Sequence, residues 1–264
     1  MAEKQPKLQL VGGGKMGQAL LAGLIRTEWA RPDELVIVEI GEQRRAELAK
    51  LFPGTVLVDS PIGGVDTIVA VKPHSVASVC GQLENCGRVI SVAAGIRIAA
   101  ISDAVEAGTT VIRVMPNTPA LIGKGVSAVA ASPGISEDDV TWATTIMAAV
   151  GSVAVVTEDE LDAVTGLSGS GPAYVFAFAE AFAAAGVKAG LSADVAETLA
   201  FQTLYGSACL LDESELGPAA LREQVTTPGG TTAAGLGVLG ETLPDLLADT
   251  VAAAAERSIE LGAQ

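Results

Sequence analysis

Aromatic and charged side chains are scarce in this chain of 264 residues: aromatics make up 3% and charged residues 18%, while 49% are hydrophobic. The core must therefore be filled by Ala, Val, Leu and Ile. Basic residues are also few, with 16 Lys and Arg against 31 Asp and Glu and a formal charge of −15. Because phosphate contacts need a basic face, we expect no nucleic acid and no anionic membrane surface among its partners.

Cysteine and histidine are equally scarce, and the whole set is Cys80, Cys86, Cys209 and His74. No two cysteines have CxxC spacing, so no zinc site of usual spacing is expected, and we predict no metal. A sparse, odd cysteine count is typical of a reducing compartment, and the charged residues before Leu8 do not resemble a signal peptide. The longest apolar stretch, Pro172 to Val187, is shorter than the roughly 20 residues that span a bilayer. We therefore expect a cytoplasmic protein.

Short β-branched runs alternate with helical patterns over the first 158 residues, which is typical of a mostly parallel sheet covered on both faces. The expected strands are Leu8–Val11, Leu35–Glu39, Thr55–Val58, Thr67–Val71, Arg88–Val92 and Val111–Val114, with Val126–Ala131 and Ser152–Val156 as candidate extensions. Helices are expected over Gly17–Thr27 and Glu42–Leu51. The pattern predicts an α/β domain over residues 1–158.

Helical patterns follow one another beyond that point, so residues 159–264 are predicted to form a separate all-α domain. The expected helices are Pro172–Ala189, Ser192–Leu211, Pro218–Val225, Thr231–Leu239 and Leu243–Leu261. They are apolar on nearly every face, and a helix of that kind must be buried. About 105 residues can hardly bury them alone. We therefore expect a subunit interface, with a compact monomeric helical domain as the alternative.

A glycine-rich turn follows the first expected strand, where Gly12-Gly13-Gly14-Lys15-Met16-Gly17 matches G-x-G-x-x-G between a strand and a helix. Gly12 allows the tight turn, Gly14 lets the backbone approach a pyrophosphate, and Gly17 permits close packing of helix on strand. Amides at the helix start face the phosphates. A plain glycine turn is the alternative, but the flanking strand and helix favour a dinucleotide-binding Rossmann domain.

Glu39 ends the second expected strand, where an acid usually bonds the adenosine ribose hydroxyls and repels a 2′-phosphate. That position favours NADH. Arg44 and Arg45 follow closely, and they could either meet a 2′-phosphate or be solvated helix residues. The pattern therefore leaves both NADPH and NADH open as the cofactor.

Three further loops follow expected strands at their carboxyl ends, where ligands of such sheets bind. In Val71-Lys72-Pro73 the proline fixes the direction of the chain, and Lys72 offers one cation near the phosphates or ribose. The alternative is that Lys72 is simply an exposed lysine. Val92-Ala93-Ala94 is small enough to let a flat ring approach the backbone. Met115–Pro119 is a stiff loop that carries an amide and a hydroxyl, or a purely structural turn. His74 is more often a surface residue than a catalytic acid in such a position.

Two segments of the helical region have the composition of anion sites. Ser170 or Gly171 could cap the helix that begins near Pro172, with an ordinary helix start as the alternative. Thr226–Thr232 places four threonines around Pro-Gly-Gly, and it offers amides and hydroxyls to a carboxylate.

Taken together, these motifs resemble the pyrroline-5-carboxylate reductase family. The matching segments are Val11–Leu20, Ala70–His74, Ser91–Gly95, Val111–Pro119, Asp162–Tyr174, Gly186–Leu191 and Gln224–Thr232. The resemblance implies an N-terminal Rossmann domain and an all-α dimerisation domain whose helices interleave in a homodimer. It also implies that dimers gather into larger rings, with a decamer of dimers as one such assembly. The implied activity is oxidation of NADPH or NADH to reduce the C=N bond of 1-pyrroline-5-carboxylate to L-proline, the final step of proline biosynthesis.

The resemblance also assigns site residues. Those implied to contact the cofactor are Gly12, Gly13, Gly14, Lys15, Met16, Gly17, Glu39, Val71, Lys72, Pro73, Val92, Ala93, Ala94 and Asn117. Those implied to contact the substrate are Glu215, Gln224, Gly230, Thr231 and Thr232. The Thr232 hydroxyl is expected near the imine nitrogen as the catalytic group. Gln224 stands where relatives carry Asn, and Glu39 differs from the small polar residue of many NADPH-preferring members.

Two other classes of function are weighed against this one. A 3-hydroxyacid dehydrogenase would carry a catalytic lysine, with an asparagine four residues later, in the helix after a glycine-rich turn, but Pro172–Glu180 offers neither. A nicotinamide-binding regulator without turnover would not need the threonines of the loop at Thr226–Thr232.

Overall fold

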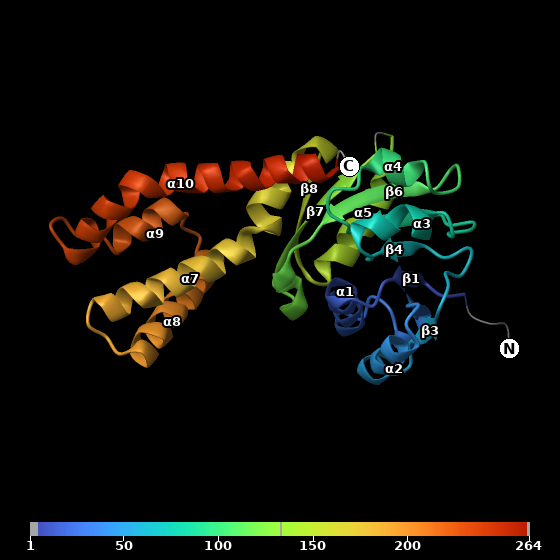
Figure 1. The fold of residues 1–264 in the computed structure, drawn as a ribbon, viewed down its shortest axis with the longest axis horizontal. Coiled ribbons are helices and arrows are strands. Elements are labelled where there is room, and N and C mark those ends of the chain that lie inside the picture. Colours follow the sequence, from blue (N-terminus) through green and yellow to red (C-terminus); the bar gives the residue numbers. More distant parts are fainter. Residues whose placement is uncertain (1–4, 133, 263–264) are drawn as a thin grey trace. The chain divides into compact units, whose positions relative to one another are not determined.

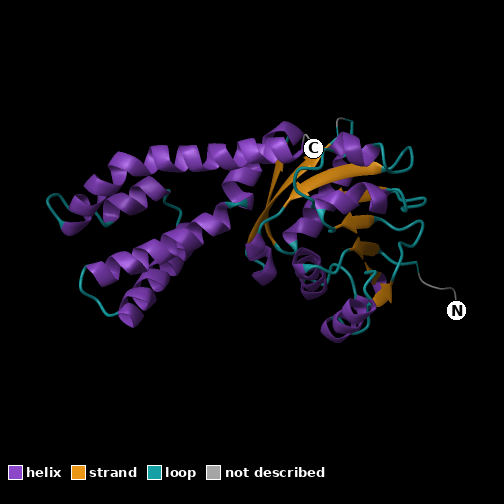
Figure 2. Ribbon diagram, in the orientation of Figure 1, coloured by secondary structure: helices purple, strands orange, loops and turns teal. Residues whose placement is uncertain are grey.

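The computed structural model describes residues 5–132 and 134–262. By their contacts these residues form two compact units (Figure 1). The first unit runs to Ser170 and includes the residues from Ala253 onward, and the second unit is Gly171–Ala252. The first unit contains the sheet and the helices that cover it, and the second is helical (Figure 2).

An eight-stranded sheet runs through the first unit, in the part of the chain that the structure describes. Its strands are β1 (Leu8–Val11), β2 (Leu35–Val38), β3 (Val56–Val58), β4 (Thr67–Val69), β5 (Arg88–Ser91), β6 (Thr110–Met115), β7 (Gly125–Ala131) and β8 (Gly151–Val156). Their order is β3-β2-β1-β4-β5-β6-β7-β8, and of the neighbouring pairs only β6 and β7 are antiparallel. The mostly parallel sheet expected from the sequence is confirmed.

Helices cover both faces of this sheet. They are α1 (Lys15–Arg26), α2 (Glu42–Leu51), α3 (Val76–Cys80), α4 (Ile98–Ser102), α5 (Glu137–Ala148) and α6 (Leu161–Val164). The sequence pattern predicts α1 and α2 but not the other four. Three of those are too short to show a helical period, whereas α5 has a signal that was available, a serine followed by three acidic residues in the first turn.

Successive strand residues point to opposite faces, and each face has its own apolar cluster. Ile90 of β5 packs with Leu10 and with residues of α1, α2 and α5. Val89, its neighbour along β5, packs with residues of α3 and α4 such as Ile101. Full burial of such a side chain stabilises the fold by about 1.5–3 kcal/mol. The aliphatic core is the one that the composition predicts.

The second unit is built from α7 (Gly171–Lys188), α8 (Ala193–Glu213), α9 (Pro218–Gln224) and α10 (Thr231–Gly262), whose last turns lie in the first unit. The two helices expected at Thr231–Leu239 and Leu243–Leu261 are wrong, because α10 is one continuous helix. Pro244 lies inside it, so a residue that usually kinks or breaks a helix does not end this one. None of the helices in the described residues is long and apolar enough to cross a membrane.

Large apolar side chains on α7 and α8 are exposed in the single chain. The exposed fraction is 63% for Phe176, 54% for Leu199 and 68% for Tyr205. Among the described residues of these two helices, only Ala196 and Ala200 are buried. A second unit that leaves this much apolar surface uncovered does not support the alternative of a compact helical domain that needs no partner.

The compact units divide at Ser170, later along the chain than the boundary near residue 158 predicted from the sequence. The reason is that Leu161 of α6 is fully buried against Ala128 and Ala130 of β7, so the residues just after β8 stay with the sheet. The predicted boundary marks the end of the strand pattern, and it stays a prediction for the functional domains.

Ser136 begins α5 as its N-cap. Its hydroxyl oxygen accepts a hydrogen bond from the Asp139 amide at 3.2 Å and donates one to the Asp139 carboxylate at 2.7 Å. The guanidinium of Arg88 donates to the same carboxylate at 2.6 Å. The pKa of Asp139 is lowered, first by the Ser136 hydroxyl and then by Arg88.

We expect Ser136→Ala to lower the free energy of unfolding by about 1 kcal/mol at neutral pH, because one helix amide loses its cap. The contribution of Asp139 is present above its unfolded pKa of about 4 and is lost as the pH falls through its lower folded pKa. The difference between the two proteins should therefore shrink in acid. Urea unfolding at several pH values measures it. Thr145→Ala, exposed on the same helix, is the control, and equal losses from both variants would contradict the cap.

Candidate functional site

The strand order reverses between β1 and β4, because β2 and β3 continue on one side of β1 and β5 and β6 on the other side of β4. Ligands of open parallel sheets bind beyond the carboxyl ends of the strands at such a point. The segment Gly12–Gly17 follows β1 there, and Val71–Pro73 follows β4. The topology thus brings together two of the loops that the sequence analysis singled out.

The glycine loop after β1 has three distinct geometries. Gly12 has a φ of +108°, and a Cβ there would lie 2.7 Å from the carbonyl oxygen of Ala70. At Gly17 a Cβ would lie 2.3 Å from the carbonyl oxygen of Gly12, so α1 could not pack as closely on the loop. A Cβ on Gly14 would meet no described heavy atom within 4 Å. The tight turn, the close packing and the open approach therefore suit a pyrophosphate at the start of α1.

Glu39 lies directly against this loop. One carboxylate oxygen accepts a hydrogen bond from the Gly13 amide at 3.2 Å, and the other accepts one from the Gly41 amide at 3.1 Å. Arg44 donates to the carbonyl oxygen of Gly13 at 3.0 Å, while Arg45 donates to that of Glu39 at 2.7 Å. Neither arginine is merely solvated. One acid and one guanidinium therefore meet at Gly13, where an adenosine ribose is expected.

The loops after β4 and β5 keep the features expected of them. Lys72 is exposed and has an extended backbone, and Pro73 begins a single 3-10 turn. His74 lies in that turn and is exposed, as a surface residue would be. After β5 the segment Val92–Ala94 runs into a turn at Gly95, which has a φ of +78°, and Ala93 is buried.

Asn117, in the loop after β6, is placed differently from the other expected cofactor contacts. Its side chain is 9% exposed. The amide oxygen accepts from the Val126 backbone at 2.9 Å, and the amide nitrogen donates to the carbonyl oxygen of Ser168 at 3.2 Å. These bonds tie the loop to the segment around Ser168. The geometry favours a structural role, and contact with a cofactor stays a prediction.

The segment around Ser168 also differs from the expectation of a free helix start. Thr165–Gly169 forms a π-helical turn that follows α6, and the Ser170 amide donates to the carbonyl oxygen of Thr165 at 2.8 Å. A wide turn of this kind uses amides that a separate helix start would present to an anion. The anion site proposed at Ser170 or Gly171 therefore has no support from the structure.

In the second unit, the threonine-rich loop makes a tight turn before α10. The Gly230 amide donates to the carbonyl oxygen of Thr227 at 2.9 Å, with Pro228 next and Gly229 at a φ of +72°. This is the pattern of a type II turn. The carbonyl oxygen of Gly230 accepts from the Ala234 amide at 3.2 Å, which starts the helix.

The start of α10 suits a carboxylate. The first amides of a helix have no partner within the helix, and its dipole is positive at this end. Thr231 is exposed and Thr232 is half-buried. Glu215, in the loop before α9, and Gln224, the last residue of α9, lie in the same unit and are exposed. Within the described residues, no hydrogen bond joins either to Thr231 or Thr232.

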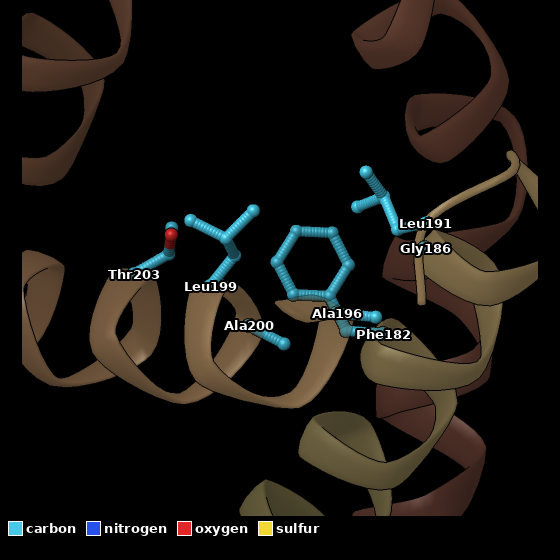
Figure 3. A pocket seen from close by; sticks show the side chains of 7 residues that line it. All are labelled: Phe182, Gly186, Leu191, Ala196, Leu199, Ala200 and Thr203. Atoms are coloured by element: carbon cyan, nitrogen blue, oxygen red, sulfur yellow. The ribbon is translucent and has the colours of Figure 1, made fainter. Parts of the chain in front are cut away.

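A hollow in the second unit has a different character. It is lined by Phe182 and Gly186 of α7 and by residues of α8 that include Leu199 and Thr203 (Figure 3). Its side chains are apolar apart from Thr203, so it offers a carboxylate a single hydroxyl and no cation. In the residues that the structure describes, no group of His, Cys, Asp and Glu is placed to hold a metal ion.

Comparison with known proteins agrees with these features. A family model described as pyrroline-5-carboxylate reductase dimerisation matches residues 158–261, and one described as NADP oxidoreductase, coenzyme F420-dependent, matches residues 7–95. The chain is 41% identical to a pyrroline-5-carboxylate reductase of Synechocystis sp., covering 97% of this chain and 98% of that protein. It is 35% identical to one of Arabidopsis thaliana, covering 97% and 95%.

Solved structures show the same likeness. A pyrroline-5-carboxylate reductase from Coxiella burnetii has a TM-score of 0.90 at 30% identity, covering 98% of this chain and 99% of that one. A pyrroline carboxylate reductase from Plasmodium falciparum, with NADP bound, has a TM-score of 0.80 at 28% identity, covering 97% and 98%.

The placement of Glu39 generates a test of cofactor preference that needs only binding. We expect Glu39→Ser to weaken NADH binding and to strengthen NADPH binding, because a carboxylate at this position would accept hydrogen bonds from the ribose hydroxyls and repel a 2′-phosphate. The ratio of the two dissociation constants should shift by roughly tenfold or more, because a hydrogen bond to a charged group contributes about 1.5–3 kcal/mol. Fluorescence titration measures both constants. Glu42→Ser removes the same charge from an exposed site, and an equal shift there would sink the assignment.

Proposed function

The chain belongs to the pyrroline-5-carboxylate reductase family, and we propose that it reduces the C=N bond of 1-pyrroline-5-carboxylate to L-proline with NADPH or NADH. This is the last step of proline biosynthesis. The observation that carries the proposal is the 41% identity to the Synechocystis enzyme over nearly the full length of both chains. The dinucleotide cradle at Gly12–Gly17 and the turn at Thr227–Gly230 supply the two binding features that such a reaction needs.

The cofactor is held by the first unit in this proposal. The start of α1, from Gly12 to Gly17, binds the pyrophosphate, and Glu39 receives the adenosine ribose. Lys72 and its neighbours Val71 and Pro73 supply one cation beside the phosphates or ribose. The small residues Val92–Ala94 let the nicotinamide ring approach the backbone, and Asn117 holds the adjacent loop. When bound, the reduced dinucleotide supplies the hydride.

The substrate is held by the second unit. The amides and hydroxyls around Gly230, Thr231 and Thr232 bind its carboxylate, and Glu215 and Gln224 lie near its ring. The hydroxyl of Thr232 orients the imine nitrogen as it becomes an amine. An imine accepts hydride more readily when protonated, and it can arrive protonated from water, so no dedicated acid is needed. The protein then mainly orients the reactants about 3–3.5 Å apart, and orientation supplies much of the rate.

The assembly is a homodimer through the C-terminal helices, and dimers gather into a larger ring. The uncovered side chains of α7 and α8 and the dimerisation model that matches residues 158–261 support the dimer. A cytoplasmic location agrees with the three cysteines, all of which are free thiols.

An absorbance assay separates this function from its rivals. Reduced dinucleotide should be oxidised only when 1-pyrroline-5-carboxylate is added, and L-proline should appear in equal amount by chromatography. A regulator would bind the dinucleotide and oxidise none of it. If the reduced dinucleotide is oxidised in the presence of a 3-oxoacid but not of the imine, the protein is a 3-hydroxyacid dehydrogenase.

Thr232→Ala should lower kcat by roughly tenfold to a hundredfold, as losing one hydrogen-bond donor at a reacting centre does. The dissociation constant for the dinucleotide should stay within about twofold, because that molecule binds elsewhere. Steady-state kinetics and fluorescence titration measure the two effects. Thr226→Ala is the matched control, since its hydroxyl donates to the carbonyl oxygen of Arg222. Unchanged turnover in Thr232→Ala would remove Thr232 from the mechanism.

A further inference from the structure

A buried carboxylate joins three elements at one end of the first unit. Asp162 of α6 is 7% exposed and Ser258 of α10 is 4% exposed. The Ser258 hydroxyl donates to one Asp162 oxygen at 2.7 Å, and Arg97 donates to the other at 3.4 Å. Ser258 is the one buried residue of α10 among those described. The carboxylate therefore links the last turns of α10 to the residues just before α4.

The same end of α10 lies on the turn that closes the loop after β5. A Cβ on Gly262 would lie 2.8 Å from the carbonyl oxygen of Gly95, so the helix end is in close contact with this turn. Ile98 is held too, because its amide donates to a carboxylate oxygen of Glu158 at 2.6 Å. The chain from Gly95 to Ile98 is thus fixed from two sides, directly after Val92–Ala94.

Stability alone does not account for this arrangement. The Asp162 carboxylate is removed from water while its partner Arg97 stays 40% exposed, so their attraction is partly screened. Apolar residues in place of buried charged groups are often neutral or stabilising. What a buried, hydrogen-bonded pair does supply is one defined geometry. Here that geometry belongs to the segment that follows Val92–Ala94.

We propose that Asp162 and Ser258 are positioning residues for hydride transfer. They lock the end of α10 onto the Gly95 turn and so set the backbone of Val92–Ala94, against which the nicotinamide ring lies. The inference rests on the proposed function for the role of that loop, but its structural half does not need a cofactor. Breaking the lock frees the loop, while the pyrophosphate site at the start of α1 is unchanged.

The test compares Ser258→Ala with Thr109→Val in the full-length protein. Thr109 is the matched control because its half-buried hydroxyl donates to the carbonyl oxygen of Cys86 at 2.9 Å, near the amino ends of β5 and β6 and so at the other end of β5 from Val92–Ala94. Without dinucleotide, amide hydrogen exchange over residues 92–98 should be faster in Ser258→Ala only. With both substrates present, the kcat of Ser258→Ala should fall by roughly tenfold or more, because a small misplacement of the reactants slows the reaction by that much.

A kinetic isotope effect distinguishes positioning from partial unfolding. With dinucleotide deuterated at the transferred position, the effect on kcat should rise in Ser258→Ala, because hydride transfer becomes slower than the other steps. A smaller fraction of folded enzyme would leave it unchanged. Ser258→Thr keeps the hydroxyl and should restore kcat. Arg97→Gln, at a half-exposed site, should act in the same direction even if Ser258→Ala fails to fold.

The outcomes separate this inference from the proposed function. If the wild-type protein does not reduce the imine, the proposed function and the catalytic half of this inference are both overturned. If it does, and Ser258→Ala and Arg97→Gln match Thr109→Val in exchange over residues 92–98 and in isotope effect, only the positioning role is overturned.

Discussion

The close approach of α1 to β1 and β4 is the constraint on which the dinucleotide site depends. It requires residues without a Cβ where the backbones meet, and Gly12 and Gly17 supply them. This contact aims the start of α1 at the point where the strand order reverses. Glu39 reaches the same loop from the end of β2, so the expected ribose and phosphate positions are set by one packing arrangement.

Electrostatics at this site must work against the charge of the whole molecule. The chain carries a formal charge of −15, yet the proposed cofactor is an anion. The attraction is therefore local: helix amides lie at the start of α1, and the guanidinium of Arg44 contacts Gly13 beside the Glu39 carboxylate. In the proposed carboxylate site at the start of α10, helix amides likewise bind the anion, together with neutral hydroxyls.

Sequence reasoning succeeded where the physical signal is local and failed where a distant partner decides. The glycine turn after Val11 can be recognised from the sequence alone, because the strand, the turn and the helix are consecutive in the chain. Asn117 stays a predicted cofactor contact, and the hydrogen bonds of its side chain to Val126 and Ser168 could not be read from the sequence. The break expected near Gly240 and Pro244 did not occur, since α10 continues through both residues.

The sequence by itself determined the α/β class, the mostly parallel sheet, the glycine cradle and the resemblance to the reductase family. Those follow from periodicity and short-range motifs, which neighbouring residues specify. Only the tertiary structure decided that Glu39 touches the Gly13 amide and that Asp162 meets Ser258, ninety-six positions away. Such contacts depend on how whole elements pack against one another. Many pairings of elements would bury apolar surface, so no local sequence pattern predicts these contacts.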